Sequence, residues 1–363
     1  MRHRDRVALA LAHEETDRCP MQISFTPEFA TRLEQEIRRG TGKLHNPHGG
    51  GNTYELERSL GQDLLLTSVG WANNYYQTCE PGGEYVDEWG VGWRAVPYET
   101  RFGRGIYTEM VGHPLADEKR LDAYAPPNPN DPRLYHDARR LIQEHGQEYW
   151  IVGVTVTTIW ETAWALRGLE RMMMDLIENP ELAARILDIP YKYHLSAATK
   201  LVELGVDMIW LGDDIGCQKG MIMSPDMWRQ TLKPRLAVFI RTLKEMNPEV
   251  KVAYHSCGNI GRVIADLVEI GVDVLNPIQP ACFDIEHLKE AFGDVLCFWG
   301  SIDEQHTLPF GTPEDVRREV HDRIRVLGRR GGLILGPTHH VQLDTPMENF
   351  QAMVDAITSP STR

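Results

Sequence analysis

The chain has 363 residues, of which 42% are hydrophobic and 25% are charged, and this composition is typical of a globular enzyme with one large domain or two ordinary domains. Its formal net charge of −14 disfavours nucleic acids and anionic membrane surfaces as general partners. The sequence contains no run of about 18 apolar residues, so no membrane span is predicted.

The first twenty residues combine basic and apolar side chains, and two interpretations are open. A signal peptide would need a longer apolar stretch than this one, which His13, Glu14 and Glu15 interrupt. We therefore expect an amphipathic first helix and a cytoplasmic protein. Six cysteines are spread along the chain without a C-x-x-C pair, so we expect most of them to be reduced core residues and not a disulfide framework.

Residues 40–130 are irregular and rich in Gly, Pro, Asn and aromatic residues. Within them, "GEYVDEWGVGWRAV" followed by "IYTEMVG" predicts a β-hairpin. We interpret this region as an insertion that lies over one end of the fold. Its aromatic side chains would form either a lid over a substrate or the small core of the hairpin region; they are Trp71, Tyr75, Tyr76, Trp89 and Trp93.

From about residue 148 onward, short apolar runs alternate with helical stretches. Strands are predicted at 149–160, 206–214, 250–258, 272–279, 294–303 and 332–340, and helices at 172–205, 224–247, 260–271, 284–293, 312–331 and 345–359. This alternation predicts an α/β protein with a parallel sheet. The number of units and the absence of a fingerprint glycine loop favour a closed (β/α)8 TIM-type barrel, with residues 1–363 as a single domain.

Polar side chains follow the predicted strands at the ends where such a barrel builds its active site. They are Thr157, Trp160, Glu161, Asp213, Asp214, His255, Cys257, Asn276, Gln279, Ser301, Asp303, Thr338, His339 and His340. Ordinary loops are polar too, but less often through His, Cys and amide side chains. The barrel mouth is therefore the expected site.

His255 and Cys257 form the sharpest motif of this set. At positions i and i+2 of an extended strand, their side chains point to the same side, and zinc binds both imidazole nitrogen and thiolate sulfur. We predict His339 as a third ligand because a closed barrel brings its mouth loops together, with His340 as the alternative. The other interpretation of the pair is a buried cysteine beside a hydrogen-bonded histidine.

The acidic and amide residues of the mouth also allow two interpretations. Asp213 and Asp214 are either a helix cap or solvated turn, or carboxylates that orient a substrate or complete a metal shell, and Glu161 is a further catalytic candidate. Singly, each amide side chain is typical of a structural role. As substrate-binding candidates we name Trp160, Gln218, Gln279, Asp303 and Gln305.

Longer stretches carry a family resemblance between residues 148 and 358. They are "IWETAWALRGLERMMMDLIENPELAARILD", "GDDIGCQKGMIMSPDMWRQTLKPRL", "YHSCGNIGRVIADLVEIGVDVLNPIQ", "FWGSIDEQHTLPFGTPEDVRREV" and "GLILGPTHHVQLDTPMENFQAM". Together they resemble the uroporphyrinogen decarboxylase superfamily, which implies a (β/α)8 barrel. The resemblance is weak over residues 25–147.

Two branches of that superfamily matter for function. Decarboxylases carry an R-Q-A-G-R motif whose arginines bind substrate carboxylates, and the corresponding region here, "CPMQISFTPEFATRL", lacks it. The chain more closely resembles the zinc-dependent methyltransferases that work with corrinoid proteins and use H-x-C plus a later cysteine as zinc ligands. "GPTHHVQ" has no cysteine at the later position, so His339 is the closest replacement.

The resemblance implies a zinc enzyme that moves a methyl group between a corrinoid protein and a small methylated substrate of the methyl ether, methylamine or methyl-thiol type. The chain has no D-x-H-x-x-G motif, so the corrinoid (cobalamin) is expected on a partner protein. A homodimer is also expected, because barrels of this superfamily often pair. The alternatives are a metal-independent decarboxylase of tetrapyrrole metabolism and a non-catalytic barrel that binds a small molecule or a corrinoid.

Overall fold

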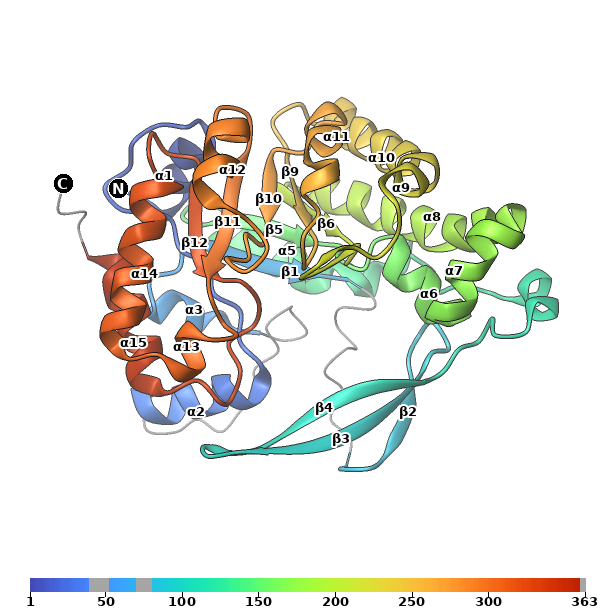
Figure 1. Ribbon diagram of the computed structural model, residues 1–363, viewed down its shortest axis with the longest axis horizontal. Helices are drawn as coiled ribbons and strands as arrows, with labels where there is room; N and C mark the ends of the chain where they lie inside the picture. Colours follow the sequence, from blue (N-terminus) through green and yellow to red (C-terminus); the bar gives the residue numbers. More distant parts are fainter. Residues whose placement is uncertain (39–51, 70–79, 360–363) are drawn as a thin grey trace.

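A seven-stranded parallel sheet forms the centre of the molecule in the computed structural model, which describes residues 1–38, 52–69 and 80–359. The strands lie in the order β1-β5-β6-β9-β10-β11-β12, and the sheet curls into a TIM-like barrel (Figure 1). Their bounds are β1 Leu64–Ser68, β5 Trp150–Val154, β6 Met208–Gly212, β9 Lys251–His255, β10 Val274–Asn276, β11 Cys297–Ile302 and β12 Leu333–Pro337.

Helices surround the sheet and connect its strands (Figure 1). The longest helix is α8, Pro180–Leu204. Helix α14 covers Pro313–Val326. The other α-helices are α1 His3–Leu11, α2 Pro27–Arg38, α3 Glu55–Ser59, α5 His136–His145, α6 Trp160–Arg167, α7 Leu169–Glu178, α9 Pro225–Thr231, α10 Lys233–Met246, α11 Ile264–Glu269, α12 Ile285–Phe292, α13 Thr307–Phe310 and α15 Met347–Thr358. Short 3-10 turns occur at Glu118–Ala123, Pro132–Tyr135 and Gly261–Val263.

An extended segment, residues 20–25, occupies the eighth position of the barrel. Met21 forms a parallel bridge with Leu335 of β12, and its carbonyl accepts a hydrogen bond from the N–H of Asp63, just before β1 (2.8 Å). The Gln62 side chain bonds to both the N–H and the carbonyl of Ile23, each at 2.9 Å. Side chains therefore replace part of the backbone ladder where the barrel closes.

Both faces of the barrel strands are buried, as expected of a parallel sheet covered by helices. Alternate residues such as Trp150, Val152 and Val154 pack inside the barrel with Trp210 and Trp299. Helix α1 adds an apolar side chain to this interior cluster and contacts β1, β5 and β12. The predicted first helix is therefore present and belongs to the barrel core, but it is not clearly amphipathic, because Arg6 lies on its buried face beside Val7 and Ala10.

A three-stranded antiparallel sheet stands apart from the barrel and runs along its lower side in Figure 1. It consists of β2 Glu84–Val86, β3 Gly92–Thr100 and β4 Gly103–Gly112. At one end Trp89 packs edge-on against Tyr193 of α8, with ring centroids 4.8 Å apart. At the other end the N–H of Ile106 donates to Glu28 of α2 (3.0 Å). The sheet thus spans two separate parts of the helical ring.

The insertion predicted for about residues 40–130 is narrower than expected, because residues 64–68 form the barrel strand β1, paired with β5. Of the predicted lid aromatics, Trp89 and Trp93 are buried and form the core of the hairpin region. Residues Trp71, Tyr75 and Tyr76 lie outside the described part of the chain. Among the described residues, no helix combines the length and apolar character needed to cross a bilayer.

The side chain of Asp63 holds the N-terminal region against the barrel. It is fully buried and accepts hydrogen bonds from Arg6 (2.6 Å), Arg18 (2.7 Å) and the N–H of Met21 (2.8 Å), and it contacts His3 (2.7 Å). Burial alone would raise the pKa of this carboxyl group, but the bonds from its partners hold that pKa below its usual value.

We predict that Asp63→Asn lowers the free energy of unfolding by about 3–5 kcal/mol, because it leaves two buried cations without their shared carboxylate. Denaturant unfolding would measure this. Asp5→Asn is the control, since Asp5 pairs with Arg2 on an exposed helix surface, and we expect less than about 0.5 kcal/mol from it. A similar loss in both variants would contradict the role given to Asp63.

The same carboxylate should contribute to the acid stability of the protein. Because its pKa is lowered on folding, its stabilisation is present above the unfolded pKa of about 3.9 and is lost as the pH falls through the lower folded value. The difference in unfolding free energy between the native chain and Asp63→Asn should therefore shrink below about pH 4. A difference that stays constant down to pH 2 would contradict this.

Candidate metal centre

His255 is the last residue of β9, and its neighbours fix both its position and its tautomer. It pairs with Gly212 of β6 on one side and Asn276 of β10 on the other. A Cβ atom at Gly212 would lie 2.2 Å from the carbonyl oxygen of His255, so only glycine fits there. Nδ1 of His255 lies 2.6 Å from Oδ1 of Asn276. Since Oδ1 can only accept, Nδ1 donates, and Nε2 is left as the ring atom that could bind a metal after losing its proton.

Cys257 follows in a tight loop that neighbouring loops hold in place. Its N–H donates to Oδ1 of Asp214 (2.7 Å), and the N–H of Gly258 donates to Oε1 of Gln279. Gly258 has a φ of +83°, and a Cβ atom there would meet the backbone N of Cys217 at 2.4 Å. The loop therefore has a fixed course that presents the thiol on the side of His255.

The geometry of these side chains fits a zinc ion. Sγ of Cys257 lies 3.7 Å from Nε2 of His255, and tetrahedral zinc with usual bond lengths separates such a sulfur and nitrogen by about 3.6 Å. A ligand atom of His339 joins them, with all three atoms within 4.8 Å of one another. Among the described residues His340 is not part of this group, although its ring lies 4.8 Å from that of His339.

His255, Cys257 and His339, here called the metal triad, come from two parts of the chain at the mouth: the end of β9 with the loop after it, and the loop after β12. Three protein donors would leave one tetrahedral position open, which is the arrangement of catalytic zinc sites. The donor set of one thiolate and two imidazoles also suits zinc better than magnesium or calcium, which prefer oxygen. The predicted ligands are therefore brought together as expected.

Three carboxyl groups lie behind the triad and connect it to α6. Asp213 is buried and accepts hydrogen bonds from the N–H groups of Ile159 (3.0 Å) and Glu161 (2.9 Å), which caps the start of α6. Burial raises the pKa of Asp213 to about 6 against the effect of these bonds. Of the two interpretations of Asp213, the structure supports the helix cap, and its predicted catalytic role has no support in these contacts.

Asp214 and Glu161 lie closer to the metal triad. Oδ1 of Asp214 is 3.4 Å from Nε2 of His255, and the N–H of Asp214 donates to Glu161 (3.1 Å). Burial and the charges of Asp214 and Asp213 raise the pKa of Glu161. Burial acts in the same direction on Asp214, but its bond to His255 lowers its pKa overall. One carboxyl group is thus set to hold a proton and the other to stay ionised.

The predicted substrate-binding residues divide into a rim pair and buried supports. Gln218 and Gln305 are exposed and share a hydrogen bond of 2.7 Å that links the β7–β8 hairpin, Gly216–Cys217 and Gly220–Met221, to the loop after β11. Asp303 accepts from the N–H of Gln305 (2.7 Å) and shapes that loop. Trp160 is fully buried in the core. The side chain of Gln279 accepts a hydrogen bond from the N–H of Gly258, in the loop that carries Cys257.

Two roles near the site were not predicted from the sequence, although Asn276 itself was named there among the polar strand-end residues. Asn276 fixes the tautomer of His255, which follows only from the alignment of β9 with β10. Glu304 has a buried Oε2 atom with no hydrogen-bond partner among the described residues, and burial with the charges of Asp303 and Asp344 raises its pKa to about 8. In the sequence, Glu304 follows Asp303 in a loop at the end of a predicted strand, and this position could have indicated that it lies at the mouth.

With this geometry established, the chain can be compared with known proteins. The sequence profile of the family "Uroporphyrinogen decarboxylase (URO-D)" matches residues 97–359. The chain belongs to this family. A methyltransferase from Methanosarcina mazei has the same fold, with a TM-score of 0.68 at 21% identity over 98% of both chains. This likeness supports the TIM-like barrel predicted from the alternation of strands and helices.

Curated relatives include methyltransferases. The chain is 27% identical over 192 residues to the methylcobamide:CoM methyltransferase MtaA of Methanosarcina barkeri, which is 53% of each protein. It is 24% identical over 207 residues to a methylated-thiol–coenzyme M methyltransferase of Methanosarcina mazei, covering 55% of this chain and 51% of that protein. The matched part therefore spans about half the length of these relatives.

We predict that protein purified without added metal contains about one zinc per chain, and that Cys257→Ala and His339→Ala lose it, because each removes one of three donors. Mass spectrometry of metal content would measure this. Cys217→Ala and His340→Ala are matched controls, since they alter neighbouring residues of the same types and should retain zinc. No zinc in the native chain, or its loss in the controls, would contradict the assignment.

We further predict that Asn276→Ala weakens zinc binding about 10–100-fold, because His255 loses the acceptor that orients its ring. Competition with a chromophoric chelator would give the affinity. Asn276→Asp keeps an acceptor at the same place and should restore most of it. Equal affinities in the native chain and Asn276→Ala would show that this hydrogen bond does not act on the metal.

Proposed function

We propose that this protein is a zinc-dependent methyltransferase that moves a methyl group between a small methylated substrate and the corrinoid of a partner protein. The substrate would be of the methyl ether, methylamine or methyl-thiol type. The observation that carries the proposal is the metal triad at the barrel mouth, in which one cysteine sulfur and two imidazole nitrogens lie within 4.8 Å of one another. The curated relatives named as methyltransferases agree with it.

When bound, zinc would supply a Lewis acid that lowers the pKa of a thiol or polarises the heteroatom that carries the methyl group. His255, Cys257 and His339 would hold the ion. The protein's own groups would orient this chemistry: Asn276 holds His255, and Asp214 holds the backbone of Cys257. Glu161, with its raised pKa, would hold a proton beside the reacting heteroatom.

The rim of the mouth would control access. The hydrogen bond between Gln218 and Gln305 lies on the surface, so its amide groups can exchange partners with a polar substrate at little cost in free energy. A corrinoid protein would approach the same open side. The antiparallel sheet β2–β3–β4 then forms the side wall of that approach.

The carboxyl groups of the mouth argue against a decarboxylase of polycarboxylate substrates. Asp214 and Asp303 follow barrel strands at this end, and their carboxylates repel a substrate that carries several carboxylates. Glu161 and Glu304, whose pKa values are raised, supply no positive charge to such a substrate. Such a substrate needs clustered arginines for binding. The strand-end residues named above include no arginine or lysine that could bind the carboxylates of such a substrate, and this disfavours the decarboxylase alternative.

The test is methyl transfer from a panel of methoxylated aromatics, methylamines and methylated thiols to free cob(I)alamin, followed by absorbance. We predict turnover of at least one class by the zinc-loaded protein. In Cys257→Ala the rate of methyl transfer should fall at least about a hundredfold, since a metal stabilises such a transition state by several kcal/mol. Cys217→Ala should keep the rate of the native chain. No turnover across the panel, in either direction of transfer, would overturn the proposal.

A further inference from the structure

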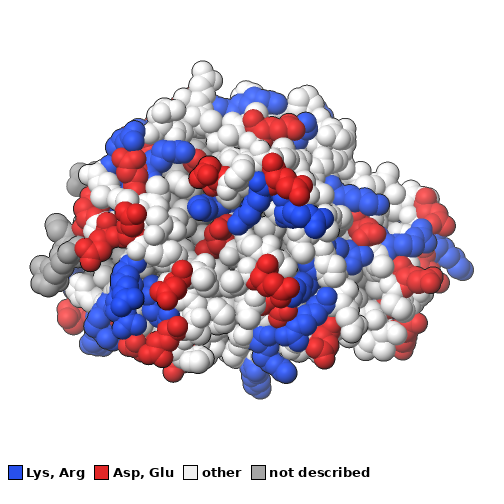
Figure 2. All heavy atoms as spheres, turned by 90° about the horizontal axis from the view of Figure 1, so that it is seen from above, with Lys and Arg blue, Asp and Glu red and all other residues white. Residues whose placement is uncertain are grey.

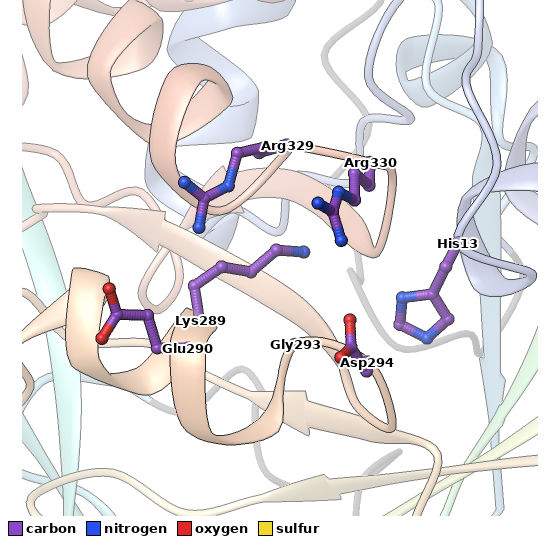
Figure 3. A pocket seen from close by; sticks show the side chains of 7 residues that line it. All are labelled: His13, Lys289, Glu290, Gly293, Asp294, Arg329 and Arg330. Carbon is purple, nitrogen blue, oxygen red and sulfur yellow. The ribbon is translucent and has the colours of Figure 1, made fainter.

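A cavity of about 450 Å³, seen from close by in Figure 3, is lined by residues that lie after α1 and before β11 and β12, at the opposite end of the barrel from the metal triad. The loops that follow α1, α12 and α14 form it, and each of these loops leads into the amino end of the barrel. Active sites of such barrels lie at the carboxyl ends of the strands, so this cavity is separate from the chemistry of the mouth. Its lining consists of His13, Lys289, Glu290, Gly293, Asp294, Arg329 and Arg330.

Three of the lining residues of this cavity are cations. Among the residues that the structure describes, neither Lys289, Arg329 nor Arg330 forms an ion pair within 4.0 Å. This is unusual in a chain that carries 52 acidic against 38 basic residues. On the face shown in Figure 2, basic side chains lie interspersed with acidic ones.

Lys289 is the most buried of the three. It is only 8% exposed, and its ammonium group donates to the carbonyl of Gly331 at 3.1 Å. Burial lowers its pKa. A buried ammonium group without a carboxylate partner is costly in free energy, and an anion in the cavity would remove that cost.

Four residues around the cavity have backbone conformations that favour glycine, and two of them are not glycine. His13 and Arg330 have φ values of +58° and +63°, in the left-handed region that side chains other than glycine rarely adopt. Gly331 and Gly332 follow at +75° and +74°, and a Cβ atom at Gly331 would lie 2.6 Å from the carbonyl oxygen of Glu14. Nδ1 of His13 is buried without a partner among the described residues. Such strain often accompanies binding sites.

We propose that this cavity binds the phosphoryl group of a small metabolite. Two arginines offer planar forks that match phosphate oxygens, and Lys289 adds a point charge between them (Figure 3). The volume lies within the usual range for small-molecule sites, about 300–1,000 Å³. Glu290 and Asp294 reduce the formal charge of the lining to +1, since three cations face two carboxylates. That small excess suits a compact anion better than a polymer.

The position of the cavity suggests what its occupancy would do. Strand β12 begins directly after Gly332 at the cavity and ends just before Thr338 and His339 at the mouth. A ligand that holds the 329–332 loop therefore acts on the strand that positions a residue of the metal triad. The site would be regulatory and not catalytic.

The experiment is isothermal titration calorimetry at low salt with three probes: inorganic phosphate, pyrophosphate and ADP. We expect one saturable site in the native chain, weakened about tenfold in Arg329→Gln and in Arg330→Gln. Glutamine keeps the same backbone demands as arginine, so the loop conformation is preserved. Arg171→Gln removes an exposed arginine on α7 and should bind as the native chain does.

Cys257→Ala separates this site from the mouth: the variant should still bind the probes saturably at one site, with an affinity that differs only by the coupling between the two sites. Tighter binding of ADP than of pyrophosphate would indicate a nucleotide, and equal binding would indicate a phosphoryl group alone. The proposal is overturned if none of the probes binds the native chain saturably at millimolar concentration. It is also overturned if both arginine variants bind as well as Arg171→Gln, or if binding is lost in Cys257→Ala.

Discussion

The curvature of the parallel sheet is the constraint on which the metal centre depends. β9 and β12 are separated by two strands, β10 and β11, so in a flat sheet their ends would lie about 14 Å apart. Closure of the barrel turns both ends toward one axis, and this brings donor atoms of His255 and His339 within 4.8 Å. The closure itself rests on residues 20–25, which Gln62 and Asp63 fasten beside β1. Contacts far from the mouth thus determine the geometry of the site.

Close to the mouth, each element of the site has its own support. The alignment of β9 with β10 places an amide oxygen behind His255, and Asp214 fixes the backbone of Cys257. Asp213 joins the same region to α6 by capping it. These contacts leave Nε2 of His255 and the thiol of Cys257 facing one point. The preorganisation means that little conformational freedom remains to be lost when a metal binds.

The sequence predicted those features that depend on local pattern. The six later strands, the H-x-C motif and the choice of His339 follow from alternation and from the rule that strand ends converge. It did not reveal β1 or residues 20–25, because β1 lies within an irregular region and the segment makes isolated bridges instead of a ladder. Nor could it separate the capping role of Asp213 from a catalytic one, since the helix that it caps begins more than 50 residues earlier.

The most direct test of the account is X-ray absorption spectroscopy of the zinc-loaded protein at the zinc edge. The account predicts one sulfur at about 2.3 Å and nitrogen or oxygen donors at about 2.0–2.1 Å, from Cys257, His255 and His339 with one exchangeable ligand. Addition of a small thiol should raise the sulfur count from one to two if the fourth position is open. A shell with no sulfur, or with two sulfurs before the thiol is added, would contradict the account.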